Sequence, residues 1–177
     1  MTARINPYKH AISATRAKAP ANIKQLNDDL FRSLIVIHDE KSALKAIKQG
    51  ADVNRRIRGL PLLTLVGSLG NNDFVQMLIN KGADANAADE TGGTLLMIAT
   101  SFGRTDLVQL LMDNIVNGVD LNVINKKHGH TALDVAGDSR QFGIANLLIS
   151  KGAKTARQLS EELCLQHLQE SKLAYFA

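Results

Sequence analysis

The feature that most constrains this chain is a short string that returns at a regular interval. Gly-Ala-Asp-Val-Asn occupies residues 50–54, and variants of it begin at Gly82, Gly118 and Gly152. These glycines are spaced 32, 36 and 34 residues apart, which is the length of one supersecondary unit. Such a period predicts a stack of similar units, with loops absorbing the small differences in spacing.

Each period holds the pattern of two short helices. Apolar segments precede the last three glycines, at residues 74–79, 107–112 and 144–149. We expect each segment to be a helix that ends where glycine adopts the left-handed conformation. A second apolar segment follows each returning Asn, and its start is marked by Pro61, Thr94 or Thr131. The two threonines can cap a helix with their hydroxyls, and the proline suits a first turn.

These residues closely resemble the ankyrin repeat. The family pattern is Gly-x-Thr-Pro-Leu-His-x-Ala-Ala-x-x-Gly-His, then a second helix ending in Leu-Leu, then Gly-Ala-Asp-Val-Asn. Residues 92–104 match it position by position, with Leu95 in place of the Pro and Met97 in place of the His. The first unit has Thr64 where the His is usual, and the third has Arg140 where a turn glycine is usual.

The resemblance covers about residues 28–172 and implies an all-α solenoid of stacked helix-turn-helix units with short β-turn fingers. We divide the chain into a basic N-terminal extension (1–27), a capping helix pair (28–54), three repeats (about 55–86, 87–122 and 123–154), a terminal helix (155–172) and a C-terminal tail (173–177). Within the cap, helices are expected at residues 30–38 and 42–48. We expect the terminal helix to close the open end of the array with Leu159, Leu163, Leu165 and Leu168.

Composition agrees with packed helices in a reducing setting. Hydrophobic residues make up 45% of the chain and aromatic residues 4%, with no Trp, so Leu, Ile, Val and Ala must form the core. Cys164 is the single cysteine and has no partner for an internal disulfide. We expect it to be buried among the leucines of the terminal helix. No apolar run reaches the roughly 18 residues of a membrane span, so we expect a soluble, cytoplasmic protein.

The sequence lacks the motifs of catalysis and of cofactor binding. Neither a phosphate-binding glycine loop nor a dinucleotide fingerprint is present. His128 and His130 form a pair at a turn tip, without a third ligand at a recognisable spacing. Asp52, Asp84 and Asp120 recur with Asn54, Asn86 and Asn122 in loops, where short polar side chains bond to nearby backbone. We therefore expect no enzyme, no cofactor and no metal.

The informative residues are those that the ankyrin pattern leaves free. In the resembling family, turn tips and the C-terminal ends of the inner helices line a concave groove that binds proteins. The candidate partner-binding residues here are Arg56, Arg58, Leu60, Leu69, Glu90, Phe102, Lys126, Lys127 and His130. Leu69 and Phe102 occupy the same repeat position, so stacking makes them neighbours. We expect an apolar pair rimmed by Arg and Lys, which is the composition of an interface hot spot.

The leading interpretation is a monomeric adaptor or regulator that binds a protein segment with acidic and apolar residues, without catalysis. A second interpretation is that Leu69 and Phe102 pack under the chain's own leader or a neighbouring loop. A third is binding of nucleic acid or another acidic surface by the leader and the basic tips, which would weaken steeply with salt. Small proteins of this family occur in eukaryotes and in intracellular bacteria that deliver them into host cells, so an effector in the host cytoplasm is one expected setting.

The leader accounts for the positive net charge of +4. Residues 1–27 hold five basic residues and no acid, while the rest of the chain carries 16 basic and 17 acidic residues. The basic balance is therefore weak support for a nucleic-acid partner. Three interpretations of the leader stay open: a flexible extension, a docked arm and a targeting segment for organelle import.

Overall fold

The structure is a computed structural model that describes residues 23–175, with side chains through residue 166. It falls into two compact units, one ending at Asp52 and one beginning at Val53. The first part of the basic extension, residues 1–22, lies outside the described residues, as do residues 176–177 of the tail and the side chain of Leu168.

The first unit is a helix pair, α1 (Ile23–Ile35) and α2 (Glu40–Lys48), whose members pack closely against each other. Helix α1 begins at Ile23, earlier than the predicted residue 30, because an apolar stripe at four-residue spacing already starts at Leu26. Residues 23–27 therefore belong to a helix and not to an extension. This pair forms a unit separate from the residues after 52, whereas the sequence assigned residues 28–172 to one array.

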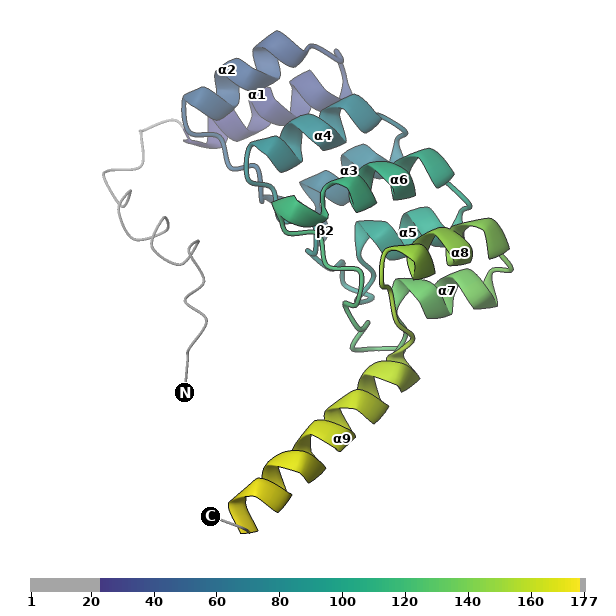
Figure 1. Cartoon of the computed structure of the whole chain (residues 1–177). Coiled ribbons are helices and arrows are strands. Elements are labelled where there is room, and N and C mark those ends of the chain that lie inside the picture. The colour runs from purple at the N-terminus through teal and green to yellow at the C-terminus, as the bar shows by residue number, and fades with distance from the viewer. Residues whose placement is uncertain (1–22, 176–177) are drawn as a thin grey trace. The chain divides into compact units, whose positions relative to one another are not determined.

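Three further helix pairs form the body of the second unit (Figure 1). They are α3 (Leu62–Ser68) with α4 (Asn72–Asn80), α5 (Leu95–Ser101) with α6 (Thr105–Asp113), and α7 (Ala132–Asp138) with α8 (Phe142–Ser150). The inner helices α3, α5 and α7 pack side by side, and the outer helices α4, α6 and α8 do the same. The core lies between these two layers and includes Leu62, Leu78, Leu95 and Leu107. The predicted all-α solenoid is confirmed.

Local signals set the ends of these helices as predicted. The hydroxyl of Thr94 accepts a hydrogen bond from the Met97 backbone N–H at 3.4 Å. Thr131 accepts one from the Asp134 N–H at 3.4 Å, and the Asp134 carboxylate in turn accepts from the Thr131 N–H, which completes a capping box. The capping roles expected of the two threonines are therefore confirmed.

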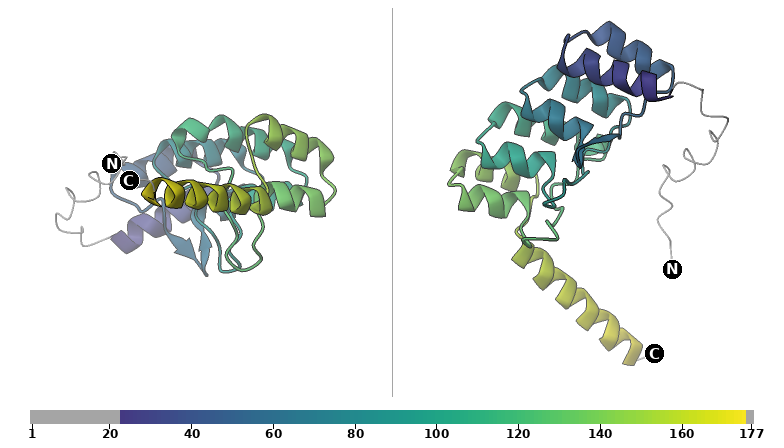
Figure 2. Two further views of the ribbon diagram at one scale, coloured as in Figure 1. Left: turned by 60° about the horizontal axis from the view of Figure 1, so that its bottom comes forward. Right: turned by 180° about the vertical axis from the view of Figure 1, so that it is seen from behind.

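Finger loops join one pair to the next. The first finger holds the two-stranded hairpin of β1 (Arg56–Ile57) and β2 (Leu60–Pro61), in which Ile57 pairs with Leu60. Figure 2 shows the hairpin and the later finger loops on the same side of the helix pairs. The longest glycine spacing has a simple cause, because the short 3₁₀ helix η2 (Ile115–Asn117) is inserted after α6.

The recurring asparagines tie each repeat to the next. The Asn86 side chain donates to the Gly118 carbonyl at 2.7 Å and accepts from the Asp120 N–H at 2.8 Å. Asn54 makes the equivalent two bonds one repeat earlier, and the side chain of Asn122 accepts from the Lys154 N–H at 2.8 Å. The predicted bonds to nearby backbone are confirmed for the aspartates, because Asp84 accepts from the Asn86 N–H at 2.9 Å and Asp120 accepts from the Asn122 N–H at 2.8 Å. The bonds of the asparagine side chains instead span about one repeat.

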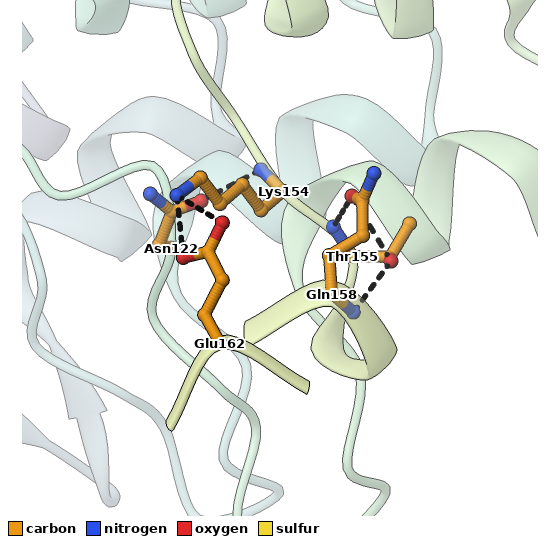
Figure 3. A network of polar contacts seen from close by, with 5 residues as sticks. All are labelled: Asn122, Lys154, Thr155, Gln158 and Glu162. Atoms are coloured by element: carbon orange, nitrogen blue, oxygen red, sulfur yellow. Dashed lines mark hydrogen bonds and ion pairs between the residues drawn. The ribbon is translucent and has the colours of Figure 1, made fainter. Parts of the chain in front are cut away.

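Helix α9 (Ala156–Tyr175) follows the last repeat and starts with a capping arrangement of Thr155 and Gln158 (Figure 3). Its Leu163 and Leu165 side chains are more than half exposed, and Cys164 is exposed as well. The prediction that these residues close the array and bury the cysteine is wrong. The inner helices begin 12 to 14 residues after the repeat glycine, but α9 begins four residues after Gly152. The finger that returns the chain to the inner layer is therefore missing.

Within the described part of the chain, no helix is both long enough and apolar enough to cross a membrane.

Candidate interaction surface

The C-terminal ends of the first two inner helices expose large apolar side chains. Leu69 and Phe102 are the C-cap residues of α3 and α5, and their side chains are 57% and 76% exposed. Each precedes a glycine in the left-handed region, Gly70 with φ 90° and Gly103 with φ 66°. This backbone ends the helix and leaves the preceding side chain in solvent. Because α3 and α5 pack side by side, the two exposed side chains lie on adjacent helix ends.

A hollow of about 340 Å³ lies next to Phe102. The residues that line it are Ser68, Leu95, Ile98, Ala99, Phe102, Arg104 and Leu107. Most of this lining is aliphatic or aromatic, and its polar groups are one hydroxyl and one guanidinium. A hollow of this size and chemistry can accept an apolar side chain of a partner.

Arg104 is a part of this surface that the sequence did not single out. Its Nη1 donates to the Gly67 carbonyl at 2.5 Å and to the Ser68 carbonyl at 3.4 Å, so a cation sits at the C-terminal end of α3, where it interacts favourably with the helix dipole. A Cβ placed on Gly70 would lie 3.6 Å from Nη2 of the same guanidinium. The sequence feature that could have pointed to Arg104 is its alignment with the last His of the ankyrin family pattern.

In the first finger, the side chain of Arg58 is exposed, whereas that of Arg56 bonds to its own turn. Arg58 has φ 52° and Gly59 has φ 80°, as a two-residue hairpin turn requires, and the Arg58 side chain is exposed. Nη1 of Arg56 donates to the Gly59 carbonyl at 2.8 Å, so this guanidinium is partly used by its own turn. Leu60 is half-buried beside it.

The second finger is organised by Asp89. Its carboxylate accepts from the N–H groups of Thr91 at 2.8 Å and Gly93 at 2.9 Å. Partial burial opposes ionisation, but these bonds and that of the Thr91 hydroxyl outweigh it and hold the pKa of Asp89 below its usual value. The neighbouring Glu90 lies against the first finger, because its carboxylate occupies the space that a Cβ on Gly59 would need. Negative charge therefore lies at the tip that carries Arg58.

The third finger carries Lys126, Lys127 and His130, all of which are exposed. The Asn125 side chain orders the turn by accepting from the Lys127 N–H at 2.9 Å. Nδ1 of His130 lies 3.2 Å from Oδ2 of Asp138 at the end of α7, so this imidazole already has an acidic partner. No group of three or more His, Cys, Asp or Glu side chains suited to a metal ion occurs among the described residues.

The candidate partner-binding residues lie at two different ends of the inner helices. The basic tips precede the inner helices, while Leu69 and Phe102 follow them, and a seven-residue helix of about 10 Å lies between. The rim of Arg and Lys from the fingers therefore stays a prediction, whereas Arg104 is a cation that lines the hollow beside Phe102.

Comparison with known proteins identifies the repeats. The ankyrin-repeat family pattern, described as three copies, matches residues 34–123 and 62–158. The chain is 38% identical over 108 residues to an ankyrin repeat and KH domain-containing protein of Caenorhabditis briggsae, covering 59% of this chain and 4% of that protein. It is 30% identical over 157 residues to the B-cell lymphoma 3 protein homolog of Mus musculus, covering 84% and 34%.

A third relative is protein phosphatase 1 regulatory subunit 12A of Mus musculus, with 33% identity over 86 residues, covering 49% of this chain and 8% of that protein. The chain thus spans at most about a third of the length of these three relatives. The family pattern matches well over half of the chain, and its matches contain the three helix pairs of the second unit. The chain belongs to the ankyrin-repeat family.

Proposed function

We propose that this protein is a monomeric, non-catalytic adaptor or regulator, and that its partner binds at the inner-helix ends around Leu69 and Phe102. Ankyrin repeats indicate a protein-interaction module, and one relative is by name a regulatory subunit. The observation that carries the proposal is the Phe102 side chain, 76% exposed beside a hollow with mainly apolar walls. Exposed aromatic residues next to a pocket are typical anchors of protein interfaces.

The partner segment carries an apolar side chain next to a carboxylate. The apolar side chain enters the hollow between Ser68 and Phe102, and the carboxylate accepts from Arg104. A guanidinium has five N–H donors, and only Nη1 of Arg104 is engaged within the described chain. The exposed Arg58, Lys126 and Lys127 add long-range attraction for an acidic segment.

The test compares Leu69→Ser/Phe102→Ser with the wild type and with Val116→Ser. The partner is first identified by affinity purification from the native cell, and its Kd for each variant is then measured by calorimetry. Burial of Phe102 contributes about 2 kcal/mol, so the double variant should bind at least about thirtyfold more weakly. Val116→Ser is the matched control, since this apolar side chain is almost fully exposed on η2.

Two outcomes would contradict the proposal. One is an unchanged Kd in the double variant with the fold intact. The other is a fall of many degrees in Tm, because that would mean that the chain's own leader or a neighbouring loop covers Leu69 and Phe102. The identity of the purified partner would also separate a cytoplasmic eukaryotic regulator from a bacterial effector in the host cytoplasm.

The basic fingertips support nucleic-acid binding less well. Glu90 places a carboxylate against the turn of the first finger, and Arg56 donates to that same turn. Nucleic-acid binding needs basic residues that are clustered on one face and available to phosphates. We therefore keep this function as the alternative.

A further inference from the structure

The outer face of α8 is apolar but uncovered. The last residue of each outer apolar segment is Ile79, Met112 or Ile149, and these are 5%, 2% and 57% exposed. Helix α6 packs against α4, and α8 packs against α6, which explains the burial of the first two. Ile149 keeps the apolar character of a covered position without a further outer helix to cover it.

Two other residues extend this face along α8. Phe142 and Ala145 lie seven and four residues before Ile149, so all three share one stripe of the helix. Phe142 is 68% exposed, whereas the equivalent first residues of α4 and α6 are the polar Asn72 and Thr105. We call Phe142, Ala145 and Ile149 the α8 stripe.

The inner helix of the last pair, α7, is in contrast polar at this end of the array. Asp134 stands on α7 where the inner helices α3 and α5 have the buried Thr64 and Met97. Its carboxylate accepts from the Ala156 N–H at 2.8 Å, and Asp138 pairs with His130 nearby. Terminal units of repeat arrays require such a polar end. Among the described residues at this end, the uncovered apolar face is therefore that of the outer helix α8, and one additional helix would cover it.

The charges around the α8 stripe select the chemistry of that helix. Residues 142–150 contain no charged side chain. Arg140 precedes α8 and Lys151 follows it, and both are exposed. The acids of the neighbouring outer helix α6 are Asp106, in its first turn, and Asp113, its last residue. A helix laid on the stripe thus meets a cation at each end.

We propose that the α8 stripe docks one amphipathic helix of a partner protein, with an apolar face on Phe142, Ala145 and Ile149 and carboxylates toward Arg140 and Lys151. The docked helix occupies the place that a further outer helix would take. This site lies on the outer layer and is independent of the inner-helix ends around Phe102.

Charge disfavours a second copy as the occupant, and capping disfavours the chain's own α9. A second copy pairing α8 with α8 would bring cations together at both ends of the stripe, whichever way the helices ran. The chain's own α9 is held at its start, because the Ala156 N–H donates to Asp134 and the Thr131 hydroxyl donates to the Lys154 carbonyl at 2.8 Å. Moving α9 across α8 would break these bonds.

The test uses a fluorescein-labelled, stapled helical peptide with leucines at positions i, i+3, i+4 and i+7 and glutamates at both ends. Its Kd for the full chain is measured by fluorescence anisotropy. We expect saturable binding that weakens at least tenfold in Ile149→Asp and at least tenfold when lysines replace the glutamates. Leu69→Ser/Phe102→Ser should bind the peptide as the wild type does, which keeps the outcome separate from that of the inner-helix site.

Folding controls accompany the measurement. Ile149→Asp should leave Tm unchanged, because the side chain is exposed, whereas Ile79→Asp at the buried equivalent position should unfold the chain. Equal peptide binding by wild type and Ile149→Asp would overturn the proposal. A fall in Tm of Ile149→Asp would also overturn it, since α8 would then be covered by the chain itself. So would a dimer in analytical ultracentrifugation that Ile149→Asp dissociates.

Discussion

Replacement of Asn86 by alanine should weaken the connection between the first and second repeats more than the same replacement at Asn122 weakens the connection between the second and third. The Asn86 side chain makes two hydrogen bonds across the repeat boundary, to the Gly118 carbonyl and from the Asp120 N–H. The variant removes both and leaves two backbone groups without a protein partner. Asn122 is the matched comparison, because it makes one such bond, from the Lys154 N–H.

The expected magnitude follows from these contacts. A hydrogen bond contributes about 1 kcal/mol net, so Asn86→Ala should lose about 2 kcal/mol, or somewhat less where water replaces the lost partner. Asn122→Ala should lose about half as much. For a chain of this size, 1 kcal/mol corresponds to about 2–4 °C in Tm, which predicts a fall of about 3–8 °C for Asn86→Ala.

The assay is urea unfolding followed by far-UV circular dichroism, since the chain has no Trp and only two Tyr. The free energies of unfolding are compared at equal m-values. Two results would refute this reasoning: an equal loss of unfolding free energy in Asn122→Ala and Asn86→Ala, or no measurable loss in either. Either result would mean that the number of side-chain hydrogen bonds across a repeat boundary does not set the stability of that boundary.

Two further predictions concern packing and pH. Gly67→Ala should destabilise the chain by about 1–3 kcal/mol, because the new Cβ would lie 2.6 Å from a methyl carbon of the buried Leu95. Gly137→Ala, at the same repeat position of α7, should instead stabilise it by about 0.5–1 kcal/mol, because nothing lies within 4 Å and alanine favours the helix. Thermal melts of both variants check the pair, and a loss of stability in Gly137→Ala would contradict it. For Asp134, partial burial opposes ionisation, but hydrogen bonds from Thr131 and the Ala156 N–H hold its pKa below the usual 3.8. Ionised Asp134 therefore stabilises the fold above about pH 4, and this stabilisation is lost as the pH falls through the lowered folded pKa. The gap in urea midpoint between wild type and Asp134→Asn should be constant from about pH 7 to 5 and shrink below about pH 4, and a gap that widens in acid would contradict this sign.

The repeats were predictable from the sequence because their signals are local. Thr94 and Thr131 cap helices through backbone groups three residues away, and the turn glycines act within their own turns. Such signals depend little on how the repeats pack against one another. For the same reason the helix pairs and the positions of Leu69 and Phe102 at helix ends followed from the pattern.

What the sequence could not provide were the contacts made across repeats. Arg104 reaches the end of α3 only because stacking brings Gly67 beside it. Leucine spacing predicted a helix after residue 155, but it does not tell what that helix packs against, and Leu163 and Leu165 are exposed. The place of a charge or a leucine in the array depends on the neighbouring unit, which no local pattern encodes.

The insertion at η2 shows where this array tolerates additional chain. The three inserted residues Ile115–Asn117 lengthen one loop while the helix pairs on either side keep their stacking. Val116 is exposed and belongs to neither proposed docking surface, so a spectroscopic label attached there would report on the molecule without replacing a residue of either one. The same loop offers a natural junction for fusing a reporter domain to the intact protein.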